Sequence, residues 1–132
     1  MQTDYLDLLY LHMWDFTTPI EEILRAFDDL VRAGKILHAG ISDTPAWVVA
    51  KANAIADLRG WTRFNVLQAE YSLLSRDVER DLLPVAEDNG MAFLAWGVLE
   101  GGALTGKYNR GKPNSQAAMP TQARRRRPRL RC

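Results

Sequence analysis

The sequence of 132 residues contains a single cysteine, Cys132, which is also its last residue. A disulfide within the chain is therefore impossible, and a reducing cytoplasm is the expected location. No apolar run approaches the roughly 20 residues that a membrane-spanning helix needs. A basic segment followed by an apolar one, which marks a secretion signal, is also missing. These absences predict a cytoplasmic protein without a membrane segment.

The last 21 positions lack acidic residues. All 16 aspartates and glutamates lie before position 112, whereas seven of the 17 lysines and arginines lie at or beyond it. Residues 1–111 are therefore acidic and predicted to fold, and residues 112–132 are predicted to form a disordered, arginine-rich tail. Such a tail could bind a polyanion through its charge, so a polyanion-binding module stays an alternative. Because the folded part is acidic and carries no nucleic-acid motif, we do not expect nucleic-acid binding.

Four dense apolar runs recur along the chain, separated by stretches with helical spacing. The first, Tyr5–Leu11, is interrupted only by Asp7, which is typical of a strand buried on both faces of a parallel sheet. The other three cover Ile36–Ile41, Phe64–Glu70 and Met91–Trp96. Strands that alternate with helices at this spacing imply parallel pairing with right-handed crossovers. The sequence therefore predicts an α/β fold with the order βαβαβαβ.

Three helices are predicted between these strands. The segment Thr17–Pro19 favours the start of the first helix, with a threonine as its cap, and Gly34 favours its end. The second helix is expected over about Thr44–Leu58. The third is expected over about Ser75–Asp88, and Pro84 within it predicts either a kink or a later start.

A polar or large aromatic side chain stands at the end of each predicted strand: His12, then Ser42 and Asp43, then Gln68, then Trp96. Because α/β barrels place their chemistry at the carboxyl ends of parallel strands, these side chains are candidates for a functional site. Ser42, His12 and Asp43 are also of nucleophile, base and acid type, so ester hydrolysis stays an alternative. No G-x-S-x-G elbow accompanies them.

Four stretches in order resemble the aldo-keto reductase family. DYLDLLYLH is similar to the family's fourth barrel strand with its active-site histidine, and GKILHAGISD is similar to the stretch that closes the fifth. FNVLQAEYSLL resembles the sixth strand with its glutamine, and FLAWGVLEGGALTGKY resembles the seventh strand and its loop. The resemblance covers about residues 3–110 and is nearest to bacterial aryl-alcohol-dehydrogenase-like members, in which Ser-Asp can replace Ser-Asn. It implies a partial (half) TIM barrel made of strands four to seven.

The resemblance implies that the substrate is a small aldehyde or ketone. His12 would hydrogen-bond the carbonyl oxygen of this substrate and help to polarise it. Trp14 would line the substrate pocket. No metal site is implied.

The resemblance also implies a nicotinamide cofactor, NADP(H). Ser42, Asp43 and Gln68 would bind the carboxamide group of the nicotinamide. Trp96 would stack on the nicotinamide ring, a position where the family often has tyrosine. Leu99, in the glycine-rich loop after Trp96, would approach the pyrophosphate.

The family's catalytic tyrosine, partner lysine and tuning aspartate lie on earlier strands than those found here. None of the four tyrosines of this chain sits in the motif of that catalytic tyrosine. Proton donation contributes about 10²–10⁴-fold to such reactions, so we expect the chain alone to be a weak or inactive NAD(P)H-dependent reductase with weakened cofactor binding. A sheet with two unprotected edges also predicts self-association, most simply as a dimer.

Overall fold

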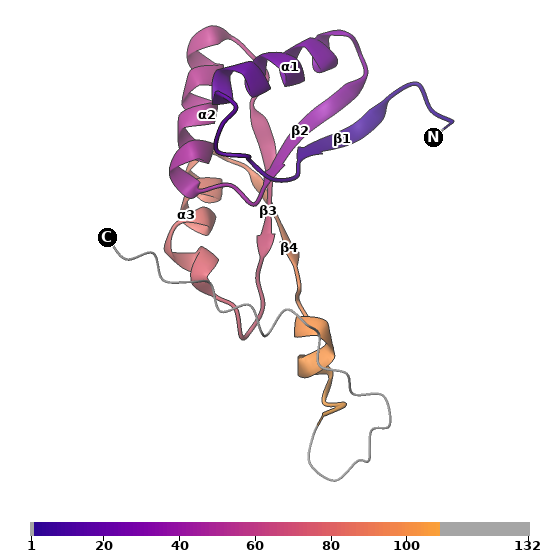
Figure 1. Cartoon of the computed structure of the whole chain (residues 1–132), viewed down its shortest axis with the longest axis vertical. Coiled ribbons are helices and arrows are strands. Elements are labelled where there is room, and N and C mark those ends of the chain that lie inside the picture. The colour runs from indigo at the N-terminus through magenta and orange to yellow at the C-terminus, as the bar shows by residue number, and fades with distance from the viewer. Residues whose placement is uncertain (1, 109–132) are drawn as a thin grey trace. The chain divides into compact units, whose positions relative to one another are not determined.

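The computed structural model describes residues 2–108, in which four strands form one sheet (Figure 1). The strands are β1 (Leu6–Leu11), β2 (Ile36–Ser42), β3 (Phe64–Glu70) and β4 (Ala92–Trp96). Their order in the sheet is their order in the chain, and each strand pairs in parallel with the next. The predicted parallel α/β fold is therefore confirmed, and this strand order is consistent with a partial TIM barrel.

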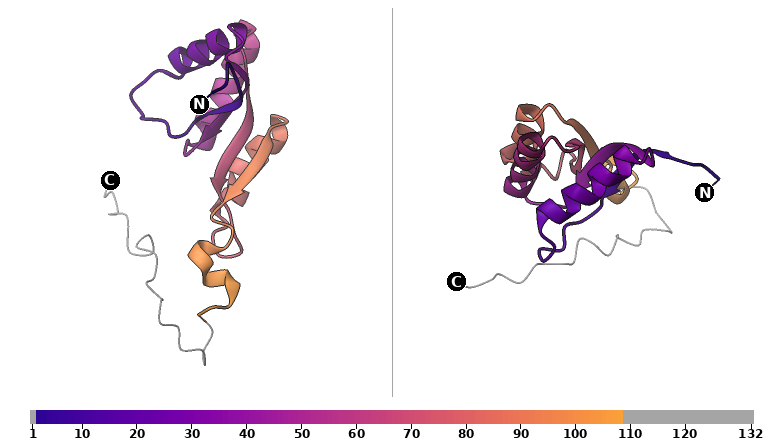
Figure 2. Two further views of the ribbon diagram at one scale, coloured as in Figure 1. Left: turned by 90° about the vertical axis from the view of Figure 1, so that its right-hand side faces the viewer. Right: turned by 90° about the horizontal axis from the view of Figure 1, so that it is seen from above.

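Three helices connect the strands: α1 (Ile20–Arg32), α2 (Ala46–Arg59) and α3 (Leu82–Asp88). Figure 2 shows these helices on one side of the sheet. Placing successive crossover helices on one side is the arrangement that right-handed connections produce in a barrel. Within residues 2–108, no helix is both long and apolar enough to cross a membrane.

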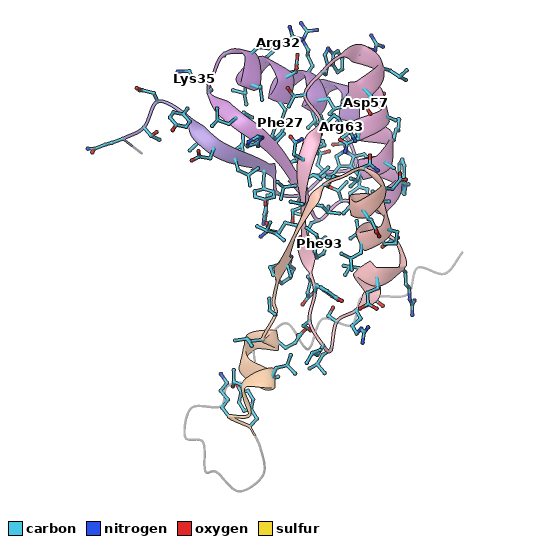
Figure 3. All side chains as sticks on the ribbon, turned by 180° about the vertical axis from the view of Figure 1, so that it is seen from behind. Phe27, Arg32, Lys35, Asp57, Arg63 and Phe93 are labelled. Atoms are coloured by element: carbon cyan, nitrogen blue, oxygen red, sulfur yellow. The ribbon has the colours of Figure 1, made fainter. Side chains whose placement is uncertain are left out.

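The core lies between the helices and one face of the sheet. Leu24 of α1, Val49 of α2 and Leu67 of β3 belong to one cluster of buried apolar side chains, and each is at most 1% exposed. Phe27 points from α1 into this cluster (Figure 3), where its ring centroid lies 5.4 Å from that of Phe64. The apolar face that helical spacing predicted for the first helix is therefore the face that packs on the sheet.

The start of α1 differs from the prediction. Its N-cap residue is Pro19, which makes no side-chain hydrogen bond to the helix. The hydroxyl of Thr18 donates instead to the carboxylate of Asp15 at 2.6 Å. The predicted threonine cap is therefore wrong, because a local acceptor in the preceding loop competes for that hydroxyl. The predicted end of the helix is confirmed, since Gly34 adopts a φ of 68° just beyond the helix.

The third helical segment is divided into two parts. A 3₁₀ turn, η1 (Asp77–Arg80), precedes α3, and Asp81 between them has φ −144° and ψ −52°. The carboxylate of Asp81 accepts a hydrogen bond from the backbone N–H of Leu82 at 2.6 Å. Pro84 consequently lies in the first turn of α3, where its missing N–H leaves no helical hydrogen bond unmade. Of the two predicted effects of Pro84, the later start is the one observed.

A bulge interrupts the pairing of β2 with β3. Consecutive residues of β2 pair with Phe64 and with Val66, which leaves Asn65 without a partner in that strand. The fully buried side chain of Asn53 in α2 hydrogen-bonds the backbone beside this bulge. Its side-chain Nδ2 donates to the carbonyl of Phe64 at 3.1 Å, and its Oδ1 accepts from the N–H of Phe64 at 3.0 Å. One side chain of a helix thus satisfies two buried backbone groups at the entrance of β3.

A buried carboxylate fixes α1 to the turn before β3. Asp28, which is 4% exposed, accepts hydrogen bonds from the backbone N–H of Thr62 at 2.9 Å, from the Thr62 hydroxyl at 3.1 Å and from Arg32 Nε at 2.6 Å. Burial alone would raise the pKa of Asp28, but the hydrogen bonds from Thr62 and Arg32 outweigh it and lower the pKa below its usual value. The ionised form therefore stabilises this contact.

A second compact unit begins at Leu99, and residues 99–108 are its described part. It contains a 3₁₀ segment, η2 (Glu100–Thr105), and the carbonyl of Leu99 accepts a hydrogen bond from the N–H of Gly102 at 2.8 Å. The predicted tail, residues 112–132, lies outside the described residues, so the tail and its boundary stay predictions.

Candidate functional site

Three of the predicted site residues share one face of the sheet at its carboxyl edge. Ser42 of β2 pairs with Gln68 of β3, and Trp96 of β4 pairs with Glu70, two residues beyond Gln68. Paired residues on neighbouring strands point to the same face, as do residues two apart in one strand. Ile41 and Leu67, which directly precede Ser42 and Gln68, belong to the core cluster between the helices and the sheet, so Ser42, Gln68 and Trp96 lie on the face opposite the helices.

Ser42 and Asp43 form the turn that leads from β2 into α2. Ser42 is 2% exposed, and its carbonyl accepts a hydrogen bond from the Thr44 hydroxyl at 2.8 Å. Asp43 is exposed and has a φ of 38°, in the left-handed region that few residues other than glycine adopt. This reversal leaves Ser42 at the strand end and sends the chain into α2 at Pro45.

His12 follows β1 directly and is exposed. The loop after it is held by Asp15, whose carboxylate accepts from the N–H of Thr17 at 2.9 Å, from the N–H of Thr18 at 2.8 Å and from the Thr18 hydroxyl. These hydrogen bonds, with that of the Thr18 hydroxyl first, hold the pKa of Asp15 far below its usual value. The loop that carries His12 and Trp14 is therefore fixed by an ionised carboxylate.

Aromatic side chains gather beside this loop. The indole Nε1 of Trp14 donates to the carbonyl of Thr18 at 3.0 Å. The ring centroid of Trp14 lies 4.8 Å from that of Phe16 and 6.0 Å from that of Trp47, the second residue of α2. Of these three aromatic residues, the sequence analysis singled out only Trp14 as a site residue. Phe16 and Trp47 could have been found by asking which aromatic residues lie within five positions of the end of a strand.

The position of Trp96 is fixed through the neighbouring strand. Its carbonyl accepts from the N–H of Tyr71 at 3.1 Å, and the Tyr71 hydroxyl donates to Glu79 at 2.7 Å. Arg76 donates to both oxygens of Glu79, at 2.8 and 3.0 Å. The hydrogen bond to Glu79 raises the pKa of Tyr71, and the hydrogen bond from Arg76 lowers the pKa of Glu79. Tyr71 therefore acts here as a structural donor.

Tyr10 of β1 pairs with Gly40, two residues before Ser42, and therefore lies on the same face of the sheet as Ser42. Its ring covers Gly40 so closely that a β-carbon on Gly40 would meet the ring carbons at 2.5 Å. The Tyr10 hydroxyl is buried and has no hydrogen-bond partner within the described part of the chain, and desolvation raises its pKa. A small residue at position 40 is thus a packing requirement of this face.

Two other chemistries find no geometric support among residues 2–108. No group of three His, Cys, Asp or Glu side chains there could hold a metal ion. No hydrogen bond in this range joins Ser42, His12 and Asp43, so the hydrolase alternative stays a prediction.

Residues 1–128 match the sequence pattern of the aldo/keto reductase family. The chain belongs to that family. It is 56% identical over 99 residues to norsolorinic acid reductase of Aspergillus flavus, a match that covers 75% of this chain and 26% of the relative. The predicted family is therefore confirmed, and the assignment of the four stretches to barrel strands four to seven stays a prediction.

Other relatives carry the name that the sequence predicted. A putative aryl-alcohol dehydrogenase of Saccharomyces cerevisiae is 47% identical over 107 residues, which is 81% of this chain and 28% of the relative. An aryl-alcohol dehydrogenase [NADP(+)] of Phanerodontia chrysosporium is 44% identical over 104 residues, which is 79% of this chain and 27% of the relative. The chain thus spans about a quarter of the length of the curated relatives it matches. These three relatives are fungal, and the predicted bacterial origin stays a prediction.

The site residues predicted from the family resemblance lie at the strand ends described above. The structure brings Ser42 and Gln68 into one row and Trp96 onto the same face. It places His12 and Trp14 at the carboxyl end of β1, in the loop fixed by Asp15. Leu99 belongs to the second unit and is 58% exposed there, so its predicted role at the pyrophosphate stays a prediction.

Proposed function

We propose that this chain is part of an NADP(H)-dependent carbonyl reductase that converts aldehydes or ketones to alcohols. The observation behind the proposal is the shared face of Ser42, Gln68 and Trp96 at the carboxyl edge of the sheet. The names of the relatives, one of which includes NADP(+), support it. Because the chain spans about a quarter of those relatives, the proposal assigns to it a share of the cofactor and substrate site.

The donor set at the strand ends fits a nicotinamide. Its carboxamide has one oxygen acceptor and one NH₂ donor, and the Ser42 hydroxyl and the Gln68 amide can each both donate and accept. Asp43, exposed at the turn, would accept from the NH₂ group, and the flat Trp96 side chain would face the ring. When bound, the reduced nicotinamide supplies the hydride. Leu99 is proposed to approach the pyrophosphate.

His12 is proposed to act on the substrate. An imidazole N–H of His12 would donate a hydrogen bond to the carbonyl oxygen, which draws electron density from the carbonyl carbon and favours hydride addition. Its exposure at the end of β1 leaves the imidazole open to a substrate. Trp14, two residues later, would line the pocket.

The expected activity of the 132 residues alone is weak. No tyrosine here sits in the family's catalytic motif, so the proton that completes the alcohol would come from His12 or from water. Binding energy for a dinucleotide is distributed over its length, so a partial site should bind it poorly. We also propose a cytoplasmic location and a dimer in which copies cover each other's open sheet edges.

NADPH binding to the purified chain tests the cofactor site by isothermal titration calorimetry. We expect a dissociation constant no tighter than high micromolar. Loss of one hydrogen-bonding group typically costs about 0.5–1.5 kcal/mol, so Gln68→Met should weaken binding by roughly 2- to 12-fold. Trp96→Ala should weaken it comparably. Asn65→Ala, an exposed position on the same strand, is the matched control. Unchanged binding in both Gln68→Met and Trp96→Ala would contradict the assigned site.

NADPH oxidation with an aromatic aldehyde tests the role of His12. We expect a rate well below the roughly 10 per second that is typical of enzymes, and a further loss in His12→Ala. A rate near that typical value, unchanged in His12→Ala, would show that another group polarises the carbonyl.

A further inference from the structure

The sheet has two outer strands whose free edges are not protected. β1 and β4 each present one row of backbone N–H and C=O groups without a strand partner among residues 2–108 (Figure 1). Edge strands of natural sheets usually carry lysine, proline or a bulge that discourages further pairing. The strand sequences LDLLYL and AFLAW contain neither lysine nor proline, and their ladders with β2 and β3 are regular. Both edges can therefore accept another strand.

Apolar side chains stand at both of these edges, on the face opposite the helices. Tyr10 of β1 and Trp96 of β4 lie on this face. Leu8 and Leu94, two residues before them, point to the same face. Leu94 is 44% exposed in a single copy, and the buried Tyr10 hydroxyl has no hydrogen-bond partner among the described residues. A neighbouring strand at either edge would therefore bury apolar surface.

The register of the three ladders advances in one direction along the sheet. Leu11, the last residue of β1, pairs with Ile41, one residue before the end of β2. Ser42, the last residue of β2, pairs with Gln68, two residues before the end of β3. The last residues of β3 and β4 pair with each other. The carboxyl ends therefore advance by three residues over three steps, an average of one residue per strand.

This advance is the one that closes a ring of eight strands. An eight-stranded parallel barrel has a shear of about eight residues, so its register advances by about one residue at each step. With one further step to β1 of a second copy, the advance reaches about four residues, which is half of what closure requires. Two copies related by a two-fold axis would therefore complete the ring.

The faces of the side chains select the same closing step independently. An advance of one residue pairs Trp96 with Tyr10 of a second copy, so that side chains on like faces meet. An advance of zero or two residues would pair Trp96 with Leu11 or Leu9, which pack against the core on the helix side. Register and face therefore agree on one closing ladder.

We propose that two copies of this chain close one eight-stranded barrel, in which β4 of each copy pairs with β1 of the other, and that they share the candidate site. This inference rests on the proposed function, because it names the partner of the same site. In one copy β1 and β4 are three strand spacings apart, roughly 14 Å, so His12 and Trp96 stand at opposite edges. In the closed barrel, His12 of the second copy follows the strand next to Trp96. Each site then takes its carbonyl donor from one copy and its nicotinamide-binding side chains from the other.

Disulfide cross-linking tests the closing ladder, which pairs Leu94 with Leu8 of the second copy. Both positions are changed to cysteine in one Cys132→Ser chain, which is oxidised and examined on a non-reducing gel. We expect a covalent dimer, because a disulfide needs a Cα separation of about 4.4–6.8 Å, which these positions do not have within one copy. Leu8→Cys with Phe93→Cys is the matched control and should stay unlinked, since Phe93 packs on the helix side. Efficient linking of Leu94→Cys alone to itself would indicate face-to-face packing and overturn the barrel.

A charged variant tests the same interface without cysteines. Leu94→Lys places a charge on the face that the barrel encloses, and light scattering should report a monomer where the wild type is a dimer. Because Leu94 is partly exposed in one copy, circular dichroism should show that the monomer keeps its secondary structure. Leu58→Lys, at an 87% exposed position of α2, is the control and should remain a dimer. A monomeric wild type, or a dimeric Leu94→Lys, would overturn the proposal.

Mixing two inactive variants tests whether the site is shared. His12→Ala and Trp96→Ala chains are refolded together from urea and assayed for NADPH oxidation with an aldehyde. Random pairing makes half of the dimers mixed, and each mixed dimer has one intact site, so about a quarter of the wild-type rate should return. No recovery, with an active wild type, would overturn the shared site. A cross-linked dimer that neither binds NADPH nor reduces the aldehyde would retain the barrel and refute the reductase with its shared site, and NADPH binding by a strictly monomeric chain would do the reverse.

Discussion

Replacing Asn53 by leucine should destabilise the fold more than its small change in shape suggests. Leucine keeps the branched outline of asparagine but cannot bond to the N–H and the carbonyl of Phe64. Asn53 is 0% exposed and Phe64 is 1% exposed, so water cannot replace the lost partners. Each buried backbone group left unpaired costs about 1–3 kcal/mol, which gives a loss of roughly 2–6 kcal/mol in the free energy of unfolding.

Urea denaturation followed by tryptophan fluorescence measures this loss. With a denaturant slope of about 2 kcal/mol per molar, the midpoint of Asn53→Leu should fall by roughly 1–3 M. Asn65→Leu, at the exposed neighbouring residue of the same bulge, should change the free energy of unfolding by less than about 0.5 kcal/mol.

Asn53→Asp separates hydrogen bonding from packing. An ionised carboxylate can accept from the N–H of Phe64 but cannot donate to its carbonyl, whereas a protonated carboxyl can do both. This variant should therefore be destabilised at pH 7 and should recover part of the loss, relative to the wild type, as the pH is lowered toward 4. Two results would refute the assigned role of the amide. One is a free energy of unfolding in Asn53→Leu within about 0.5 kcal/mol of the wild type. The other is a loss of stability in Asn53→Asp that does not vary with pH.

Three further outcomes follow from contacts described above. Gly40→Ala should lower the free energy of unfolding by about 1–3 kcal/mol, because its β-carbon would displace the Tyr10 ring; thermal unfolding measures this, and an unchanged midpoint would contradict it. The lowered pKa of Asp28 means that its stabilisation is present above the unfolded carboxyl pKa and is lost as the pH falls through the lower folded value. Asp28→Asn should therefore lose less stability than the wild type between pH 5 and 2, in urea curves at each pH. Light scattering at micromolar concentration should report self-association, which a monodisperse monomer would contradict.

Most of the strand positions could be predicted because the information is local. The run Phe64–Glu70 is the observed extent of β3, since apolar density and flanking polar residues are read directly from the chain. The cap of α1 could not be predicted in the same way. Thr18 is a good capping residue by type, but its hydroxyl had a second acceptor within reach, Asp15, and geometry decided between the two.

The parts that sequence reasoning missed depend on contacts between distant segments. Asn53 reads as an ordinary polar residue in a helix, and its role arises only because a bulge 11 residues later brings Phe64 beneath it. Trp47 likewise reads as part of an apolar helix, and only the folded chain sets it against Trp14. The strand-end residues could be named as a set because each stands at the end of an apolar run, whereas the register that aligns Ser42 with Gln68 contains a bulge that the sequence does not mark.

Because every strand pairs with the next strand in the chain, the sheet can fold through local contacts. Each ladder joins residues that are 25 to 30 positions apart, so no contact in the sheet must wait for the two ends of the chain to meet. The hydrogen bonds of the sheet are therefore a sum of contacts between adjacent units, whereas the apolar cluster is shared by residues of α1, α2, α3 and the sheet. A strand–helix–strand unit can form its own ladder, but its helix is buried fully only when the neighbouring units are in place.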